Sequence, residues 1–306
     1  GTGRKKGVVH INIYTQCCGI VLLMTILWFY LRQERLHLNT GKAFFHTLLV
    51  ALFSIVMDAL SIVVICNADN LPLVFVKFVC KSYLISLVGL ALCAVYYICT
   101  DIYTKKVQYR KALYLNFAIC LIVVPLIYAL PIQIHCELGG KEVYSYGPSV
   151  MTAYIAAVIY LVINLVLLVS KRAVIRESRR KAMSFWMLIW IGSALIQFFR
   201  NELLIVGFAG AVGIMVLYIK LENPETNLDR QTGLFNQTAL TRYVRQLSNR
   251  EKHFSLVLMV FEHSFYKNIS QESETAAEME MIRFITKVPG TMAFKTAGDE
   301  IMLLYE

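Results

Sequence analysis

Three ionisable side chains lie inside long apolar runs. Asp58 lies within the run Ala43–Cys66, and Lys77 and Lys81 lie four residues apart, on one helical face, within the run Pro72–Thr100. Asp58 and Lys81 reach a similar depth, roughly 12–14 Å at about 1.5 Å per residue. An unpaired charge in a bilayer costs about 2.5–3.5 kcal/mol on insertion scales, so we expect Asp58 and Lys81 to pair. Such a pair is either a ligand or stimulus site or a structural ion pair, and Lys77 can snorkel to the outer interface.

Two adjacent carboxylates, Asp299 and Glu300, lie near the end of the chain. They follow Gly298 in a polar segment flanked by the apolar stretches Thr291–Lys295 and Ile301–Tyr305, a pattern that predicts a β-hairpin. Gly and Asp are ordinary turn residues, so this segment alone predicts only a turn.

Two segments of the tail together resemble GGDEF domains, the diguanylate cyclase family. Leu228–Asn236 reads L-D-R-Q-T-G-L-F-N and is similar to the family's entry signature D-x-L-T-G-L-x-N-R. Phe294–Ile301 reads F-K-T-A-G-D-E-I and is similar to the signature hairpin Y-R-x-G-G-D-E-F. The resemblance covers Asp229–Glu306, the N-terminal half of such a domain, so we expect a truncated or fragmentary gene product.

The resemblance implies chemistry for these residues. Diguanylate cyclases join two GTP molecules, held by two facing domains, into cyclic di-GMP, which implies Mg²⁺, GTP and a homodimer formed through this domain. By resemblance, Asp299 and Glu300 hold the metal and catalytic positions, while Ala297 and Gly298 form the turn beside the phosphates. Asn268 falls near the family's guanine-contacting position. Positioning and charge neutralisation are what phosphoryl transfer needs.

The sequence departs from the family at a metal ligand. The family's strand ends in D-x-D-H-F-K, whereas this chain reads V-F-E-H-S-F-Y-K from Val260. Val260 or Phe261 therefore takes the metal position, and Glu262 would reach the metal only in a shifted register. The inhibitory R-x-x-D motif is also absent, since Val288–Thr291 reads V-P-G-T. We expect a degenerate domain with weak or no cyclase activity; an active diguanylate cyclase is the alternative.

Seven apolar runs are long enough to cross about 30 Å of hydrocarbon, and in lipid each must be helical. They are Val9–Leu31, Ala43–Cys66, Pro72–Thr100, Ala112–Leu130, Val150–Ser170, Ala182–Phe199 and Leu203–Ile219. The fold expected is an all-α seven-span bundle over residues 1–219, a linker over 220–228 and part of an α/β, nucleotidyl-cyclase-like domain over 229–306.

The loops predict the orientation of the bundle. Basic residues follow the first, third and fifth runs, most densely in Lys171–Lys181, whereas Asn67–Leu71 and Pro131–Ser149 carry no net positive charge. Basic loops face the cytoplasm, so we expect the N-terminus outside the cell and the tail in the cytoplasm. The resemblance to GGDEF domains implies that the membrane is a bacterial cytoplasmic membrane. Arg4, Lys5 and Lys6 point the other way, against three later loops.

The tail pattern predicts a mixed module. Asn236 can cap a helix to about Ser248 with one apolar face. Phe254–Phe261 has the length of a strand, and Glu272–Lys287 reads as a second helix before the hairpin.

Composition separates the classes of function. The chain has 306 residues, 58% hydrophobic and only 16% charged, with a net charge of +10. Its basic residues lie mostly in short loops, which fits a membrane protein in contact with lipids and predicts no nucleic-acid partner. Together with this composition, the resemblance to GGDEF domains implies a membrane sensor that responds to an unidentified small molecule or membrane stimulus and regulates a downstream output domain such as EAL in cyclic di-GMP turnover.

Two other classes share some of these features. A G-protein-coupled-type receptor has seven spans, and Cys80 and Cys136 mimic its disulfide, but the N-P-x-x-Y motif is missing. A transporter would show broken helices or repeat symmetry, and neither is visible. No spacing of the eight cysteines suggests zinc.

Overall fold

The structure is a computed structural model that describes residues 13–33, 36, 38–103, 106–136, 143–200, 204–260 and 271–305, apart from the side chains of 106, 198, 271–275 and 278. The chain divides into two compact units, a helical bundle that ends at Glu222 and a C-terminal unit that begins at Asn223. Leu36 and Leu38, from the segment between the first two helices, pack in the C-terminal unit.

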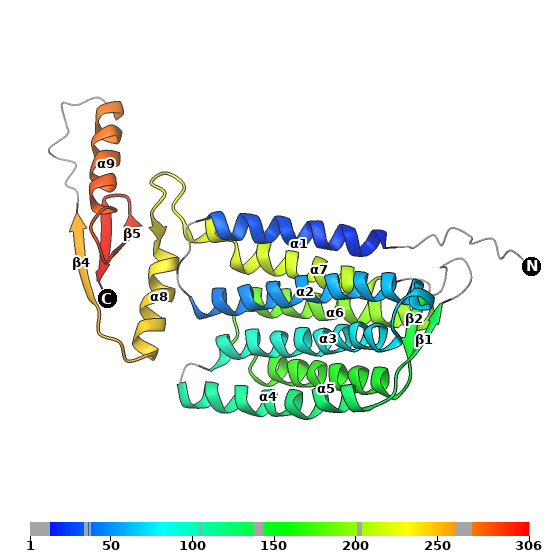
Figure 1. Ribbon diagram of the computed structural model, residues 1–306. Coiled ribbons are helices and arrows are strands. Elements are labelled where there is room, and N and C mark those ends of the chain that lie inside the picture. Colours follow the sequence, from blue (N-terminus) through cyan, green and yellow to red (C-terminus); the bar gives the residue numbers. More distant parts are fainter. Residues whose placement is uncertain are drawn as a thin grey trace, which may run out of the picture. The chain divides into compact units, whose positions relative to one another are not determined.

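Long apolar helices build the first unit (Figure 1). They are α1 (Tyr14–Arg32), α2 (Asn39–Cys66), α3 (Leu73–Ile102), α4 (Lys106–Ala129), α5 (Pro148–Ser170), α6 (Glu177–Phe199) and α7 (Val206–Leu217). A π-helical turn, Tyr218–Glu222, continues α7, and a 3-10 turn, Ala68–Asn70, follows α2.

Among the described residues, six helical segments are long and apolar enough to cross a membrane, namely α1 to α5 and the segment that starts with α7. Helix α6 is 23 residues long but is not one of the six, and it begins with a strongly charged turn. Large apolar side chains such as Val21, Leu121 and Val158 are exposed on the outside of the bundle. Such a surface suits a lipid environment, and the six apolar segments are compatible with a multi-pass membrane protein.

Helix α3 organises the bundle because it contributes to both of its buried clusters. One cluster joins α3 to α1, α2, α6 and α7, with Tyr97 and Ile214 fully buried. The other joins α3 to α2, α4 and α5, with Val88 and Tyr160 fully buried. Helix α3 packs mainly on α2 and α5, whereas α7 packs mainly on α6 and α1.

A two-stranded hairpin lies between α4 and α5, where the sequence predicted only a loop. Strand β1 (Gln133–Cys136) pairs antiparallel with β2 (Val143–Tyr146). Gly147, with φ of +114°, follows β2 in a conformation that suits glycine, and Pro148 starts the next helix.

In its described residues, the C-terminal unit contains four strands and two helices. They are β3 (Phe235–Asn236), α8 (Gln237–Asn249), β4 (Ser255–Val260), α9 (Gln271–Ile285), β5 (Thr291–Ala297) and β6 (Glu300–Tyr305), after a 3-10 turn at Pro224–Asn227. The strand order is β3-β5-β6-β4, with β6 antiparallel to both of its neighbours and β3 parallel to β5. The unit β4–α9–β5 is therefore a split βαβ with β6 between its strands. The predicted succession of helix, strand, helix and hairpin is confirmed.

The two helices bury alternate residues of the hairpin strands. Phe294 and Leu304 cluster with the predicted apolar face of α8, whereas Ala293 and Leu303 cluster with α9. Successive side chains of a strand point to opposite faces, so each helix has its own small core on the sheet.

Candidate functional site

The β5–β6 hairpin presents the two carboxylates that the sequence singled out. Ala297 pairs with Glu300 across the two-residue turn of Gly298 and Asp299. Apart from its two neighbours in the chain, no described residue has an atom within 4 Å of the position that a Cβ on Gly298 would take, so the described part of the unit leaves the space above the turn open. Thr296 Oγ1 donates to a carboxylate oxygen of Glu300 at 3.3 Å, which helps to hold that side chain at the tip.

The end of β4 lies beside this hairpin. In the antiparallel register of β4 and β6, Val260 is paired with Glu300. The structure therefore places an aliphatic side chain, 62% exposed, next to the carboxylates, as the sequence predicted. Glu262 and Asn268, the two other predicted ligands, lie outside the described residues.

The segment that resembles the entry signature folds into a tight turn. Asp229 accepts hydrogen bonds from the backbone N–H of Thr232 at 2.9 Å and from its hydroxyl at 2.7 Å. The backbone N–H of Gly233 donates to the carbonyl of Asp229 at 2.9 Å, and Gly233 adopts a φ of +72°. Burial raises the pKa of Asp229, but the bonds from Thr232 and Gln231 and the charge of Lys295 outweigh it, so the net pKa is lowered.

The two signature segments lie in one sheet. Directly after the turn, β3 pairs with β5 at Phe235 with Phe294 and at Asn236 with Lys295. Asn236 also caps α8, because its side chain accepts from the N–H of Ala239 at 3.0 Å, as the sequence predicted. Residues about sixty positions apart are thus brought together by the fold.

The donor set at the hairpin suits a single hard cation only in part. Asp299 and Glu300 supply carboxylate oxygens of the kind that Mg²⁺ prefers, and the open turn leaves room for a phosphate. Among the described residues, no group of three or more His, Cys, Asp or Glu side chains could hold a metal ion. The described residues therefore do not fit the set of three carboxylates that the family resemblance implies.

The predicted pair of Asp58 and Lys81 is wrong. Asp58 accepts a hydrogen bond from Gln16 Nε2 of α1 at 3.0 Å and another from the hydroxyl of Tyr83. Lys81 instead donates to the carbonyls of Tyr128 and Leu130, at 2.7 and 2.8 Å, where α4 ends. The last carbonyls of a helix have no partner within the helix, so they attract the ammonium group.

The remaining predicted residues of the bundle also have other surroundings. Lys77 is half-buried one turn before Lys81 and forms no ion pair with a described residue. Cys80 is buried in α3, and the sulfur of Cys136 lies 4.0 Å from that of Cys66 instead. The structure thus gives no basis for the receptor-like pairing of Cys80 with Cys136.

A buried ionic network links α3, α6 and the π-helical turn after α7, and the sequence did not reveal it. Arg179 lies 3.0 Å from Glu222 and 3.6 Å from Asp101. The hydroxyl of Tyr97 bonds to Glu222, and Arg179 and Glu222 are each 8% exposed. In the sequence, Arg179 is one of several basic residues in Lys171–Lys181, a pattern that predicts a cytoplasmic loop and not a buried ion pair. Asp101 and Glu222 each follow the end of an apolar run, and these acidic residues were the signal from which partners of Arg179 could have been inferred.

Comparison with known proteins adds no identity. No family model matches the chain, and no curated protein matches it.

Proposed function

We propose that this chain is a membrane signalling protein whose C-terminal unit is a degenerate GGDEF-type module. In this proposal the module binds Mg²⁺ and GTP weakly, makes little or no cyclic di-GMP, and regulates an output domain such as EAL. The bundle receives a membrane or small-molecule stimulus and passes it to the module.

Two features of the tail support the family assignment. The segments that resemble the two signatures lie on neighbouring strands, β3 and β5, although about sixty residues separate them. The carboxylates lie at the tip of a hairpin whose second strand, β6, is the middle strand of a split βαβ. If the two short motifs matched by chance, nothing would require them to lie on neighbouring strands, or the carboxylates to lie at the tip of such a hairpin.

The pairing of Val260 with Glu300 carries the proposal of weak catalysis. Hard cations need oxygen ligands, and the isopropyl group of Val260 offers none. Two carboxylates and the open turn at Gly298 are sufficient for loose binding of one Mg²⁺–GTP. The C-terminal unit would therefore keep nucleotide binding and lose turnover.

The membrane arrangement that we propose has seven spans, with α6 as the sixth. Helix α6 packs closely on α7, and its Trp186 is buried in the cluster that joins α3 to α1, α2, α6 and α7. Helix α6 therefore belongs to the same unit as the six apolar segments. Its charged first turn, Glu177–Lys181, would lie at the membrane surface with the basic loop before it. In this arrangement the tail would lie in the cytoplasm of a bacterial cell, in keeping with the basic loops, and two copies would associate through the C-terminal units.

The test measures binding and turnover on the same preparation. The full chain, purified in detergent, is titrated with a fluorescent GTP analogue with and without Mg²⁺, and cyclic di-GMP is quantified by chromatography. We expect Mg²⁺-dependent binding that Glu300→Gln weakens, with product at background. Glu280→Gln, which neutralises an exposed carboxylate on α9, is the matched control and should leave binding unchanged.

Two outcomes would contradict this proposal. Binding of GTP that is absent, or equal in Glu300→Gln and the parent chain, would remove the nucleotide-sensing role. Abundant cyclic di-GMP that disappears in Glu300→Gln would show an active cyclase and would imply another ligand for the metal.

A further inference from the structure

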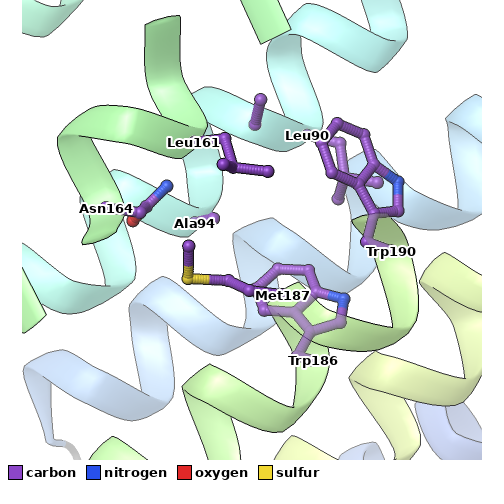
Figure 2. Close-up of a pocket in the computed structure, with 8 residues that line it drawn as sticks. Leu90, Ala94, Leu161, Asn164, Trp186, Met187 and Trp190 are labelled. Atoms are coloured by element: carbon purple, nitrogen blue, oxygen red, sulfur yellow. The ribbon is translucent and has the colours of Figure 1, made fainter. Parts of the chain in front are cut away.

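A pocket lies inside the bundle between α3, α5 and α6. About 380 Å³ between its walls is not filled by atoms, part of it open to the outside of the bundle, and the pocket is lined by Leu90, Ala91, Ala94, Leu161, Asn164, Trp186, Met187 and Trp190. Figure 2 shows Asn164 on one side of the pocket in this view and Trp190 on the other. The pocket lies where the two buried clusters of the bundle meet, because Leu90 and Ala94 belong to one and Ala91 to the other.

The pocket is apolar except for groups whose hydrogen-bonding capacity is unused. Asn164 is 4% exposed; its Nδ2 donates to the carbonyl of Tyr160 at 3.0 Å, but its Oδ1 has no partner among the described residues. The indole N–H of Trp190 also has no described partner. A buried polar group without a partner is destabilising, so these atoms would gain from a ligand that hydrogen-bonds.

The ring of Trp186 forms a wall of the pocket, whereas its indole nitrogen faces α7. Its ring lies directly over Gly213 of α7, where a Cβ would come within 2.2 Å of Nε1. The indole nitrogen therefore faces α7, and the absence of a side chain at Gly213 is what admits the ring. With Trp186 set aside, Asn164 and Trp190 remain as the pocket-lining residues with a polar atom that has no described partner.

The surroundings indicate how a ligand would enter. Helix α5 packs mainly on α3, and α6 packs mainly on α7, so α5 and α6 make little contact with each other although they are consecutive. The lipid-facing side of α5 exposes Val158, Val162 and Leu165. Entry between α5 and α6 would thus come from the hydrocarbon of the bilayer, not from water.

We propose that this pocket binds one membrane-dissolved ligand that has an alkyl chain and a terminal hydroxyl group. The chain would fill the space against Leu90, Leu161 and Met187, and the hydroxyl would donate to Asn164 Oδ1. Among the described residues no charged side chain lines the pocket, so an anionic or cationic headgroup would find no partner there. The proposal needs only that the bundle lies in a bilayer, and it does not depend on the nucleotide role of the C-terminal unit.

The tryptophans of the pocket report on its occupancy. The chain has three tryptophans, of which Trp28 is exposed on α1, so Trp28→Phe leaves only the two in the pocket as fluorophores. This variant, in phosphatidylcholine nanodiscs, is titrated with an ω-bromoalkanol and with a bromoalkane of equal chain length, whose bromine quenches indole fluorescence on contact. We expect saturable quenching by the alkanol at roughly three- to tenfold lower concentration, the range that one hydrogen bond supplies.

Matched variants assign the effect to Asn164. Adding Asn164→Leu should raise the alkanol concentration at half-quenching to that of the bromoalkane. Asn116→Leu is the control, because Asn116 is equally buried and bonds a carbonyl four residues earlier on α4, yet lies outside the pocket. Ala94→Leu, which keeps Asn164 but fills the pocket, should abolish saturable quenching by both probes and serves if Asn164→Leu does not fold.

Three results would overturn the proposal. The alkanol and the bromoalkane quench equally and without saturation, which means that the pocket takes lipid chains without selection. In the second result, Asn116→Leu weakens quenching by the alkanol as much as Asn164→Leu does. In the third, Ala94→Leu leaves the saturable quenching intact.

Discussion

Val260 of β4 and Glu300 of β6 are directly paired across two antiparallel strands. This register places an exposed aliphatic side chain beside the carboxylate-bearing hairpin, and the turn of Gly298 and Asp299 lies immediately before Glu300. The hairpin geometry is thus intact, while the chemistry on the neighbouring strand is altered. A change at one position should therefore have a large effect on metal affinity.

Replacing Val260 by aspartate should create a better cation site. The substitution Val260→Asp adds a carboxylate next to Glu300, and we expect Mg²⁺-dependent binding of GTP to tighten roughly tenfold, since carboxylate number tunes the affinity of hard-cation sites. Leu258→Asp is the control, because Leu258 is exposed on the same face of β4 but is paired with Met302. Equal effects of the two substitutions would mean that added charge, and not its position, changes binding.

The turn at Asp229 should give the C-terminal unit a component of stability that depends on pH. The folded state lowers the pKa of Asp229, chiefly because hydrogen bonds from Thr232 outweigh the effect of burial. Its contribution is therefore complete above the unfolded value of about 3.9 and is lost as the pH falls from there through the lower folded pKa. Carboxyl-¹³C NMR of aspartate-labelled protein should show this group titrating below that value, with Asp229→Asn identifying the signal. A titration at or above the ordinary value would contradict the role of the turn.

Local features of the C-terminal unit were predictable from the sequence because they depend on neighbours in the chain. Asn236 caps α8 through a bond to an N–H three residues later, and Gly298 with Asp299 suffices to predict the turn between β5 and β6. Strand β4 was recognisable by its length and apolar character. The parallel pairing of β3 with β5 was not, because nothing local specifies which strands become neighbours.

Partners inside the bundle were harder to predict. The sequence gives the depth of Asp58 and Lys81 but not the direction in which each helix turns, and the two side chains bond different helices. Gln16 was overlooked because a neutral amide in an apolar run carries no charge signal. The β1–β2 hairpin was missed because each strand has only four residues, too few for a clear alternation.

The proposed topology can be tested with single cysteines. In a chain whose eight native cysteines are replaced by alanine or serine, we place Tyr146→Cys on β2 and Ser248→Cys on α8, both at exposed positions. An impermeant maleimide added to intact cells should label position 146, and position 248 only after lysis, because the basic loops fix the tail inside. Labelling of position 248 but not of position 146 in intact cells would reverse the orientation, and labelling of both would mean that an even number of spans separates them.

Replacing Arg179, which lies in the buried ionic network, should destabilise the bundle more than replacing its basic neighbour Arg180. Arg179→Met removes the cation that lies 3.0 Å from Glu222 and leaves that buried carboxylate uncompensated, which should cost about 3–5 kcal/mol. Adding Glu222→Gln removes the more deeply buried of the two carboxylates that Arg179 compensated, leaving Asp101, and keeps a hydrogen-bonding group beside Tyr97, so the double variant should be more stable than Arg179→Met alone. Arg180→Met is the control, because Arg180 forms no ion pair with a described residue and makes a long hydrogen bond, 3.4 Å, to the carbonyl of Arg172, so we expect about 0.5 kcal/mol or less. Thermal unfolding of the four proteins in one detergent measures the differences. A double variant that is less stable than Arg179→Met would show that Glu222 stabilises the bundle through groups other than Arg179, and the charge argument would then be wrong.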